Sequence, residues 1–473
     1  MSRLAPLPCL AWIFLVMVQT SLEAADHQRP NLLFIIADDC TYRDLGCYGG
    51  QAKTPNIDRL AGEGMRFTRC FQAAPMCSPT RHNIYTGLYP VSSGAYPNHT
   101  FAKPGTRSVV HYLQPLGYRV ALSGKRHIAT KDVFPFEYLG KGNNPDPEAI
   151  NQWMAECKQS DTPFCLYACS NEPHSPWNKG DPSQYDADKI ELPPYFVDTP
   201  TTRQSMVKYL AEITYYDGQV GQCLELLEQH GLQDNTLVMV VSEQGSSFPF
   251  GKWTCYDTGL QSAMIVRWPG HVQPGTVTEA MVEYVDVLPT FLDACGGEIP
   301  QVLEGRSFVP VLKGQRNNHK DYAFGLMTTR GIINGSEQFG IRSVRSTAFK
   351  YIRNLTPEET FRNACVTSAI FSSWQEKATA GDADAAEKVR RYQHRPHEEL
   401  YAITDDCYEW KNLADDPAYA KVKRELSQQL DAWMKSQGDL GKATELAALE
   451  HQTRALKQKT PKNDRKKNRK KRK

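Results

Sequence analysis

One short segment combines a thiol, a helix start and a cation, namely residues Cys77 to Arg81. Ser78 is suited to cap a helix and Pro79 to occupy its first position. The free N–H groups and the dipole at such a helix start attract an anion. A cysteine at this place, with Arg81 one turn into the helix, can become a low-pKa thiolate. The segment therefore predicts a nucleophile that meets an anionic substrate.

Four further polar clusters follow apolar runs of strand length. They are Asp38-Asp39 after residues 31–37, Lys125 and His127 after 118–122, His174 after 164–169, and Glu243-Gln244 after 236–241. In an open α/β sheet, ligands bind outside the carboxyl ends of the strands, so the four clusters together predict a site. Each cluster alone has an ordinary interpretation as a turn, a solvated lysine or a structural histidine.

The elements that must position these residues alternate between strands and helices. The continuous apolar runs are typical of strands buried on both faces of a parallel sheet. Helical stretches are expected at 54–63, 80–86, 207–230 and 284–294. This alternation predicts an α/β fold with a large, mostly parallel sheet between helices.

The pattern changes after about residue 320. Residues 339–345 and 349–353 predict two strands joined by a turn, 399–403 a third strand, and 418–436 a packed helix. Residues 371–398 are charged and alanine-rich, as in an insertion. We therefore expect an export signal over 1–25, a catalytic domain over 26–320, an antiparallel sheet with a helix over 321–445, and a basic, disordered tail over 446–473.

Length and hydropathy exclude two classes of protein. The 473 residues, 40% of them hydrophobic, suffice for a large core in two or three domains, so a disulfide-stapled miniprotein is excluded. No internal run of about 18 apolar residues exists, which excludes a protein with several membrane spans. The ten apolar residues 9–18, between Arg3 and Ala24-Ala25, predict an export signal and a periplasmic or secreted protein, with an N-terminal membrane anchor as the alternative. Export permits disulfides among the remaining twelve cysteines, whose pairing the sequence leaves open.

Charge is distributed unevenly along the chain. Residues 457–473 carry eleven Lys or Arg and one Asp, so residues 1–456 have a net charge of −8. An acidic body is not typical of a nucleic-acid-binding domain. The tail is interpreted either as a solvated segment or as one that attracts sulfated polymers or an anionic cell surface.

With these motifs in view, the chain resembles the sulfatase family. Cys77 to Arg81 matches the family signature Cys-x-Pro-x-Arg, and Gly124 to His127 is similar to its second signature. Further matches are Asp38-Asp39, residues 173–177, Gly251-Lys252 and residues 399–414. The resemblance implies an alkaline phosphatase-like fold. It also implies that a formylglycine-generating enzyme converts Cys77 to formylglycine (3-oxoalanine), an aldehyde held as its hydrate.

The resemblance also implies a metal site. Its ligands would be Asp38, Asp39, Glu243, Gln244 and an oxygen of modified Cys77. Most sulfatases have Asp followed by Asn or His where this chain has Glu243-Gln244, and each of these side chains is one methylene longer. Ca²⁺ tolerates such a change better than Mg²⁺, because Ca²⁺ accepts six to eight oxygens in flexible geometry. We therefore expect Ca²⁺.

The remaining roles follow from the same resemblance. Lys125, Lys252 and His174 would neutralise the sulfuryl oxygens with the cation. One hydroxyl of the hydrate would attack sulfur, and His174 or Lys252 would protonate the leaving atom. Loss of a proton from the second hydroxyl, to His127, would then expel sulfate. Arg81 would orient the hydrate.

A narrower likeness concerns the substrate. Residues 87–99 and 248–257 look like the heparan N-sulfatase branch, whose substrate is a sulfamate on the glucosamine of the glycosaminoglycan heparan sulfate. Asn98, His99 and Asp257 would then contact the sugar. Two alternatives remain open: an O-sulfatase or arylsulfatase, and a non-catalytic module that binds sulfated glycans.

Overall fold

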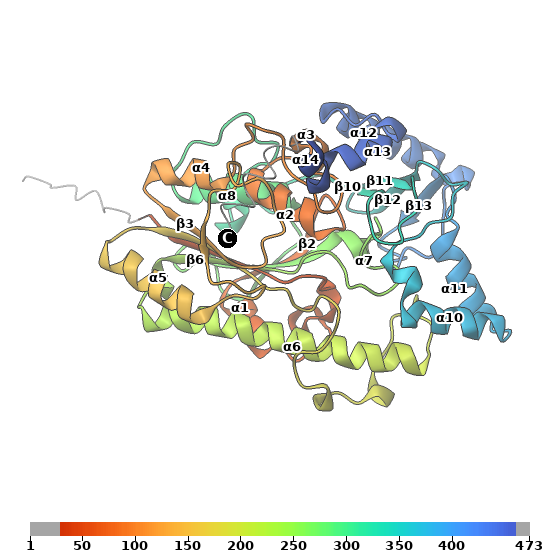
Figure 1. The fold of residues 1–473 in the computed structure, drawn as a ribbon, viewed down its shortest axis with the longest axis horizontal. Coiled ribbons are helices and arrows are strands. Elements are labelled where there is room, and N and C mark those ends of the chain that lie inside the picture. Colours follow the sequence, from red (N-terminus) through yellow and green to blue (C-terminus); the bar gives the residue numbers. More distant parts are fainter. Residues whose placement is uncertain (1–28, 460–473) are drawn as a thin grey trace, which may run out of the picture.

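A mixed nine-stranded sheet forms the centre of the protein, of which the computed structural model describes residues 29–459 (Figure 1). The strand order is β4-β3-β5-β1-β6-β7-β2-β8, with β9 also paired to β2. The bounds, in that order, are Glu137–Leu139, Arg119–Gly124, Phe164–Cys169, Asn31–Ile36, Thr236–Val241, Gln261–Arg267, Met65–Phe71 and Thr276–Thr278, with Val282–Glu283 for β9.

The strands that carry the predicted polar clusters lie side by side and run parallel. β1 pairs with β5 on one side and β6 on the other, and β3 pairs with β5. Only β7 runs antiparallel to its neighbours among the described strands of this sheet. Every residue of β1, β5 and β6 is buried, which explains their continuous apolar sequences.

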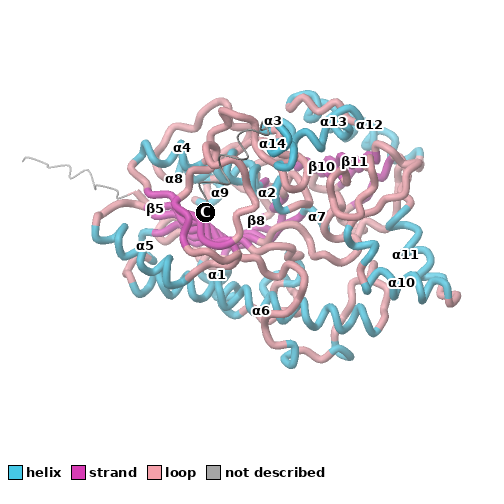
Figure 2. Tube along the Cα trace, viewed as in Figure 1, coloured by secondary structure: helices cyan, strands magenta, loops and turns pink. Residues whose placement is uncertain are grey.

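Helices cover both faces of the sheet, as Figures 1 and 2 show. Leu33 and Ile35 of β1 belong to the core that includes α1, α5 and α6. Leu32 and Phe34, which point the other way, belong to the core that includes α2, α4 and α8. The helix bounds are Pro55–Glu63 (α1), Cys77–Thr86 (α2), Pro90–Ser93 (α3), Val109–Leu113 (α4), Pro147–Gln159 (α5), Pro200–Gln229 (α6), Asp257–Leu260 (α7), Val287–Ala294 (α8) and Val309–Leu312 (α9).

A second sheet of four antiparallel strands follows, in the order β10-β11-β12-β13. Its strands are Ala323–Thr328, Gly340–Arg345, Phe349–Asn354 and Glu398–Ala402, and helix α12 (Ala420–Ser436) packs on it through Leu426 and Leu430. The predicted α/β class with a smaller antiparallel sheet and helix is thus confirmed, although β10 was not expected.

The ordered chain continues beyond the predicted start of the tail at residue 446. Helices α13 (Lys442–Ala447) and α14 (Thr453–Lys459) follow α12, and Gln452 forms a β-bridge with Thr100. Ala448 and Gln452 are buried. The predicted boundary at 446 was therefore too early, because a polar sequence can pack on a domain that precedes it by hundreds of residues.

The predicted insertion forms two helices, α10 (Ala369–Thr379) and α11 (Ala383–Gln393). They pack on the start of α6, where Trp374 Nε1 donates to Thr202 Oγ1 at 2.9 Å. Lys388 Nζ also donates to the carbonyl of Phe196 at 2.9 Å. The insertion is therefore packed on the part of the chain that contains the nine-stranded sheet, although it lies between two strands of the second sheet.

The predicted export signal lies outside the described residues. Among helices of residues 29–459, none combines the length and apolar character needed to cross a membrane. The twelve cysteines of this part of the chain are all free thiols.

Candidate active site

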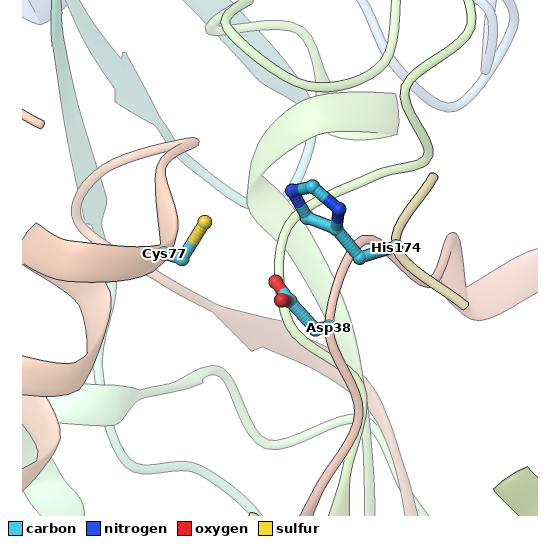
Figure 3. A group of neighbouring side chains, drawn as sticks. All are labelled: Asp38, Cys77 and His174. Atoms are coloured by element: carbon cyan, nitrogen blue, oxygen red, sulfur yellow. The ribbon is translucent and has the colours of Figure 1, made fainter. Parts of the chain in front are cut away.

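The predicted site residues meet at the carboxyl edge of the parallel strands. Ile36 of β1 is paired with Cys169 of β5 and with Val241 of β6, and Cys169 is paired with Gly124 of β3. The four strands therefore end in one row, and the segments that follow them carry the predicted side chains. Figure 3 shows the Cys77 sulfur directed toward the gap between Asp38 and His174.

Cys77 is the first residue of α2, so the helix begins two residues earlier than it would with a cap at Ser78. The helix has no side-chain cap at Met76, and Ser78 Oγ instead donates to the carbonyl of His127 at 2.9 Å. Burial, with Glu243 and Asp39 adding to its effect, raises the pKa of the Cys77 thiol to about 11. The interpretation of Cys77 as a low-pKa thiolate was therefore wrong, and the unmodified thiol is a poor nucleophile here.

The predicted metal ligands form one buried cluster. One ligand atom from each of Asp38, Asp39, Cys77 and Glu243 lies within 4.8 Å of the others, and all four side chains are buried. Gln244 Nε2 lies 2.6 Å from Asp39 Oδ1 and 2.9 Å from Glu243 Oε2. So many buried carboxylate oxygens in one place favour a bound cation.

The amide of Gln244 tests whether the cluster suits a bound cation. Its nitrogen faces the carboxylates, whereas its oxygen Oε1 is buried without a hydrogen-bond partner. Rotation of the amide by half a turn would direct that oxygen into the cluster, as a hard divalent cation requires. The residues present therefore fit such an ion.

Arg81 extends from α2 beneath the cluster and is fully buried. Its Nε lies 2.9 Å from Glu243 Oε1, and its Nη1 donates to the carbonyl of Lys125 at 3.1 Å. Arg81 thus links the Cys77 helix to the segments after β3 and β6, which is a positioning role.

Two lysines and a histidine surround the aspartates. Lys252 Nζ lies 2.7 Å from Asp39 Oδ1, and Lys125 Nζ is paired with Asp38 Oδ2. Burial lowers the pKa of Lys125 to about 7. His174 Nε2 lies 3.6 Å from Asp39 Oδ2; this carboxylate raises the pKa of His174, but burial, Lys252 and Lys125 together bring it below its usual value. The site therefore offers an anion the ammonium group of Lys252, the amine of Lys125, whose pKa is near neutrality, and an imidazole.

His127 and His99 form a pair at the rim of the site. His127 Nε2 lies 2.9 Å from His99 Nδ1, and His127 Nδ1 is buried without a hydrogen-bond partner. Burial, with Lys125 and His99 adding to it, lowers the pKa of His127 well below its usual value. Its ring is therefore in the neutral form. Asn98 lies beside this pair, with Oδ1 accepting from the His99 backbone at 3.0 Å.

Asp257 is not part of this cluster. Its two carboxylate oxygens accept from Arg345 at 2.9 Å and from Lys350 at 2.7 Å, and all three side chains are buried. The prediction of a sugar contact at Asp257 is therefore corrected. The residue joins α7 to strands β11 and β12 of the second sheet.

Sequence reasoning missed Ser247, whose Oγ donates to Asp39 Oδ2 at 2.9 Å. No local sequence pattern marks Ser247, but the loops of the site share an unusual backbone conformation. Of eight described non-glycine residues with positive φ, five lie in these loops: Asp39, His99, His127, Phe250 and Trp253. Such conformations persist where the surrounding structure enforces them, often at functional sites.

Comparisons with known proteins agree with this geometry. Residues 30–297 match the family described as Sulfatase, and residues 245–362 match the family described as N-sulphoglucosamine sulphohydrolase, C-terminal. An ulvan-active sulfatase of Formosa agariphila is 33% identical, covering 88% of this chain and 82% of the relative. Human N-sulphoglucosamine sulphohydrolase is 29% identical, covering 86% of this chain and 90% of the relative.

Solved structures share the fold. A protein in complex with its substrate D-glucosamine-2-N,6-O-disulfate gives a TM-score of 0.66 at 20% identity, covering 88% of this chain and 99% of that chain. A phosphonate monoester hydrolase from Silicibacter pomeroyi gives 0.64 at 19% identity, covering 87% and 96%. At such identities the similarity concerns the fold alone.

Proposed function

Because this chain belongs to the sulfatase family, we propose that it removes sulfate from a sulfated sugar, with an N-sulfated glucosamine residue as the first candidate substrate. One observation supports this type of reaction. Cys77 is the first residue of a buried helix, and its side chain lies in a cluster of three carboxylates and two lysines. The match of residues 245–362 to the C-terminal family of N-sulphoglucosamine sulphohydrolases supports the substrate.

Members of the family generally use a formylglycine and a divalent metal ion, and the acidic cluster is a candidate site for the ion. We propose Ca²⁺, held by Asp38, Asp39, Glu243, Gln244 and the modified side chain of Cys77. The flexible coordination of Ca²⁺ accommodates the longer side chains of Glu243 and Gln244. When bound, the ion supplies positive charge toward the sulfuryl oxygens.

The chain's own side chains bind the substrate and move protons. Lys125 and Lys252 bind the sulfuryl oxygens. Their side chains are held in the site by Asp38 and Asp39, and the negative charge of the sulfate group attracts their positive charge. The formylglycine hydrate at position 77 supplies the nucleophilic oxygen. His174 or Lys252 gives a proton to the leaving nitrogen or oxygen, and neutral His127 accepts a proton from the hydrate. Water is consumed overall, and the products are sulfate and the free amine or alcohol.

An O-sulfated polysaccharide is the second candidate substrate. The observation that favours it is the 33% identity to an ulvan-active sulfatase, compared with 29% to the human N-sulphoglucosamine sulphohydrolase. The same side chains serve either reaction, since only the atom that leaves sulfur changes.

Maturation and location belong to the same proposal. A formylglycine-generating enzyme would modify Cys77 before the chain folds, because the thiol is 2% exposed in the folded protein. The apolar residues 9–18 would direct export to the periplasm or the exterior.

The test is sulfate release from purified enzyme with N-sulfated glucosamine, O-sulfated glucosamine, ulvan oligosaccharides and an aryl sulfate. We expect release from a sulfated sugar in the presence of Ca²⁺, and loss of release when the metal is chelated. Release from the aryl sulfate alone would contradict the sugar substrate. Binding of the sugars without any release would favour the non-catalytic alternative.

A further inference from the structure

A pocket of about 260 Å³ opens beside the site. Ser175, Trp177, Ser247 and Trp253 line it from the catalytic domain, and Ser368 and Ala369 line it from the start of α10. The inserted helices therefore form part of a wall next to the predicted chemistry.

The pocket borders the site, because one of its lining residues, Ser247, contacts Asp39. Ser175 follows His174 and Trp253 follows Lys252, and these two neighbours are the candidates for protonating the leaving atom. Ser247 connects the pocket to the metal cluster, since its Oγ donates to Asp39. The pocket is therefore a candidate position for the group to which the sulfate is attached.

The walls of the pocket are held in place. Trp177 Nε1 donates to the carbonyl of Pro173 at 2.9 Å, and its ring stacks on Phe248 with centroids 4.9 Å apart. On the opposite side, Ser368 Oγ caps α10 by accepting from Phe371 N. A preformed wall lowers the ordering cost of binding a ligand.

The lining contains indole rings, small apolar side chains and serine hydroxyls, and no charged side chain. Indole faces suit the C–H surface of a sugar ring, and hydroxyls suit its polar edge. Lys252 Nζ lies 5.0 Å from the centroid of the Trp253 ring, but it is already paired with Asp39. An anionic group in the pocket would therefore lose hydration without meeting an unpaired cation. We propose that the pocket binds the sugar ring that carries the scissile sulfate, and selects against a second anionic group on that ring.

This inference rests on the proposed function, and it adds a substrate rule. The preferred ring carries one sulfate, whichever atom that sulfate is attached to. Selectivity arises from the α10 wall, which lies outside the Cys77 to Arg81 signature and which no sequence motif predicted.

The first experiment compares kcat/KM for singly and doubly sulfated rings of the same sugar, for example glucosamine N-sulfate against glucosamine N,6-O-disulfate. We expect a preference of about tenfold or more for the single sulfate, carried mainly by KM. Equal or higher kcat/KM for the doubly sulfated ring would overturn the proposal. If neither sugar releases sulfate while an aryl sulfate does, the proposed function fails first.

The second experiment places a cation on the pocket wall. Ala369 is exposed and lines the pocket, whereas Ala380 is exposed at the other end of α10 and does not line it. We expect Ala369→Arg to reduce the preference for the singly sulfated ring by about tenfold, because its guanidinium can pair with the second sulfate. We expect Ala380→Arg to behave as the wild type. Unchanged selectivity in a folded Ala369→Arg variant, or an equal shift in both variants, would contradict the role of the pocket.

Discussion

Single side chains account for most of the chemistry that we propose. Gln244 is an example: it differs from the residue type of most sulfatases, yet its amide contacts the same carboxylates that would hold a cation. Its unpartnered oxygen is explained when the amide turns toward an ion. Glu243 and Gln244 therefore keep oxygen atoms available to a cation, and they differ from the usual residues in the length of their side chains.

Metal binding is expected to stabilise the folded protein. Asp38, Asp39 and Glu243 are fully buried, so an ion that neutralises them binds the native state far better than the unfolded chain. We expect Ca²⁺ at one hundred times its Kd to add about 2.7 kcal/mol to the free energy of unfolding. Thermal unfolding with increasing Ca²⁺ after chelation measures this. The same rise of Tm in Asp38→Asn as in the wild type would contradict the assigned site.

Lys252 is expected to contribute to catalysis beyond binding. Its ammonium group is buried against Asp39, where it can strengthen its contact as charge develops on the transferred sulfuryl group. We expect Lys252→Ala to lower kcat by about 10²–10³-fold, as for loss of one oxyanion-stabilising donor. The steady-state kinetics of sulfate release measure the effect. A change in KM alone would assign Lys252 to ground-state binding.

At the scale of elements, the two sheets are connected by buried charge. Asp257 of α7 bonds to Arg345 of β11 and Lys350 of β12. Removing its charge leaves the buried Arg345 without its carboxylate partner and leaves Lys350 with only Glu409, 3.5 Å away. We therefore expect Asp257→Asn to lower the free energy of unfolding by about 3–5 kcal/mol. Denaturant unfolding measures the loss.

An exposed pair provides the control for this prediction. Asp431 is 59% exposed and pairs with Arg353 at 2.6 Å. We expect Asp431→Asn to cost about 1 kcal/mol or less. An effect of Asp257→Asn on KM without loss of stability would restore the sugar contact that the structure argues against.

Helix α2 should respond to acid through His82. The ring is buried, with Nδ1 2.7 Å from the Ser78 carbonyl, and burial lowers its pKa to about 4. Because the folded state resists protonation between the ordinary value of 6.5 and 4, stability falls as the pH drops through that window. We expect a loss of about 3 kcal/mol that is absent from His82→Gln. Equal pH dependence of unfolding in the two proteins would contradict this prediction.

The sequence predicts best those elements whose structure depends on burial alone. Residues 31–36, 164–169 and 236–241 are buried on both faces, and their apolar runs show it. Strand β2 (Met65–Phe71) was missed because Arg66, Thr68 and Arg69 interrupt its apolar residues. Helix α6 begins at Pro200, seven residues before its apolar periodicity begins, although Thr199 caps it by accepting from Thr202 N.

The sequence predicted those site residues that directly follow strands or belong to a motif. The shared row of strand ends brings Asp38, Lys125, His174 and Glu243 together, as parallel topology requires. Ser247, the role of Asp257 and the α10 wall were not predictable in this way. They depend on contacts between distant segments, which no local pattern specifies.

At the scale of the whole molecule, the C-terminal segment 460–473 and the chain before it have net charges of opposite sign. Residues 460–473 carry nine Lys or Arg and one Asp, while the chain before them has a net charge of −6. If this segment attracts sulfated polymers, its removal should lower the salt concentration that elutes the protein from heparin. Chromatography of the full chain and of a chain ending at residue 459 tests this. Equal elution would favour the solvated tail.

The central claim is that position 77 acts as a formylglycine beside a divalent cation. Mass spectrometry of the peptide that contains residue 77, from protein made in a host with a formylglycine-generating enzyme, tests it most directly when paired with sulfate release. We predict the mass of an aldehyde or its hydrate for the wild type, and no release from Cys77→Ala that folds and binds Ca²⁺. An unmodified thiol in an enzyme that still releases sulfate, or full activity of Cys77→Ala, would contradict the account.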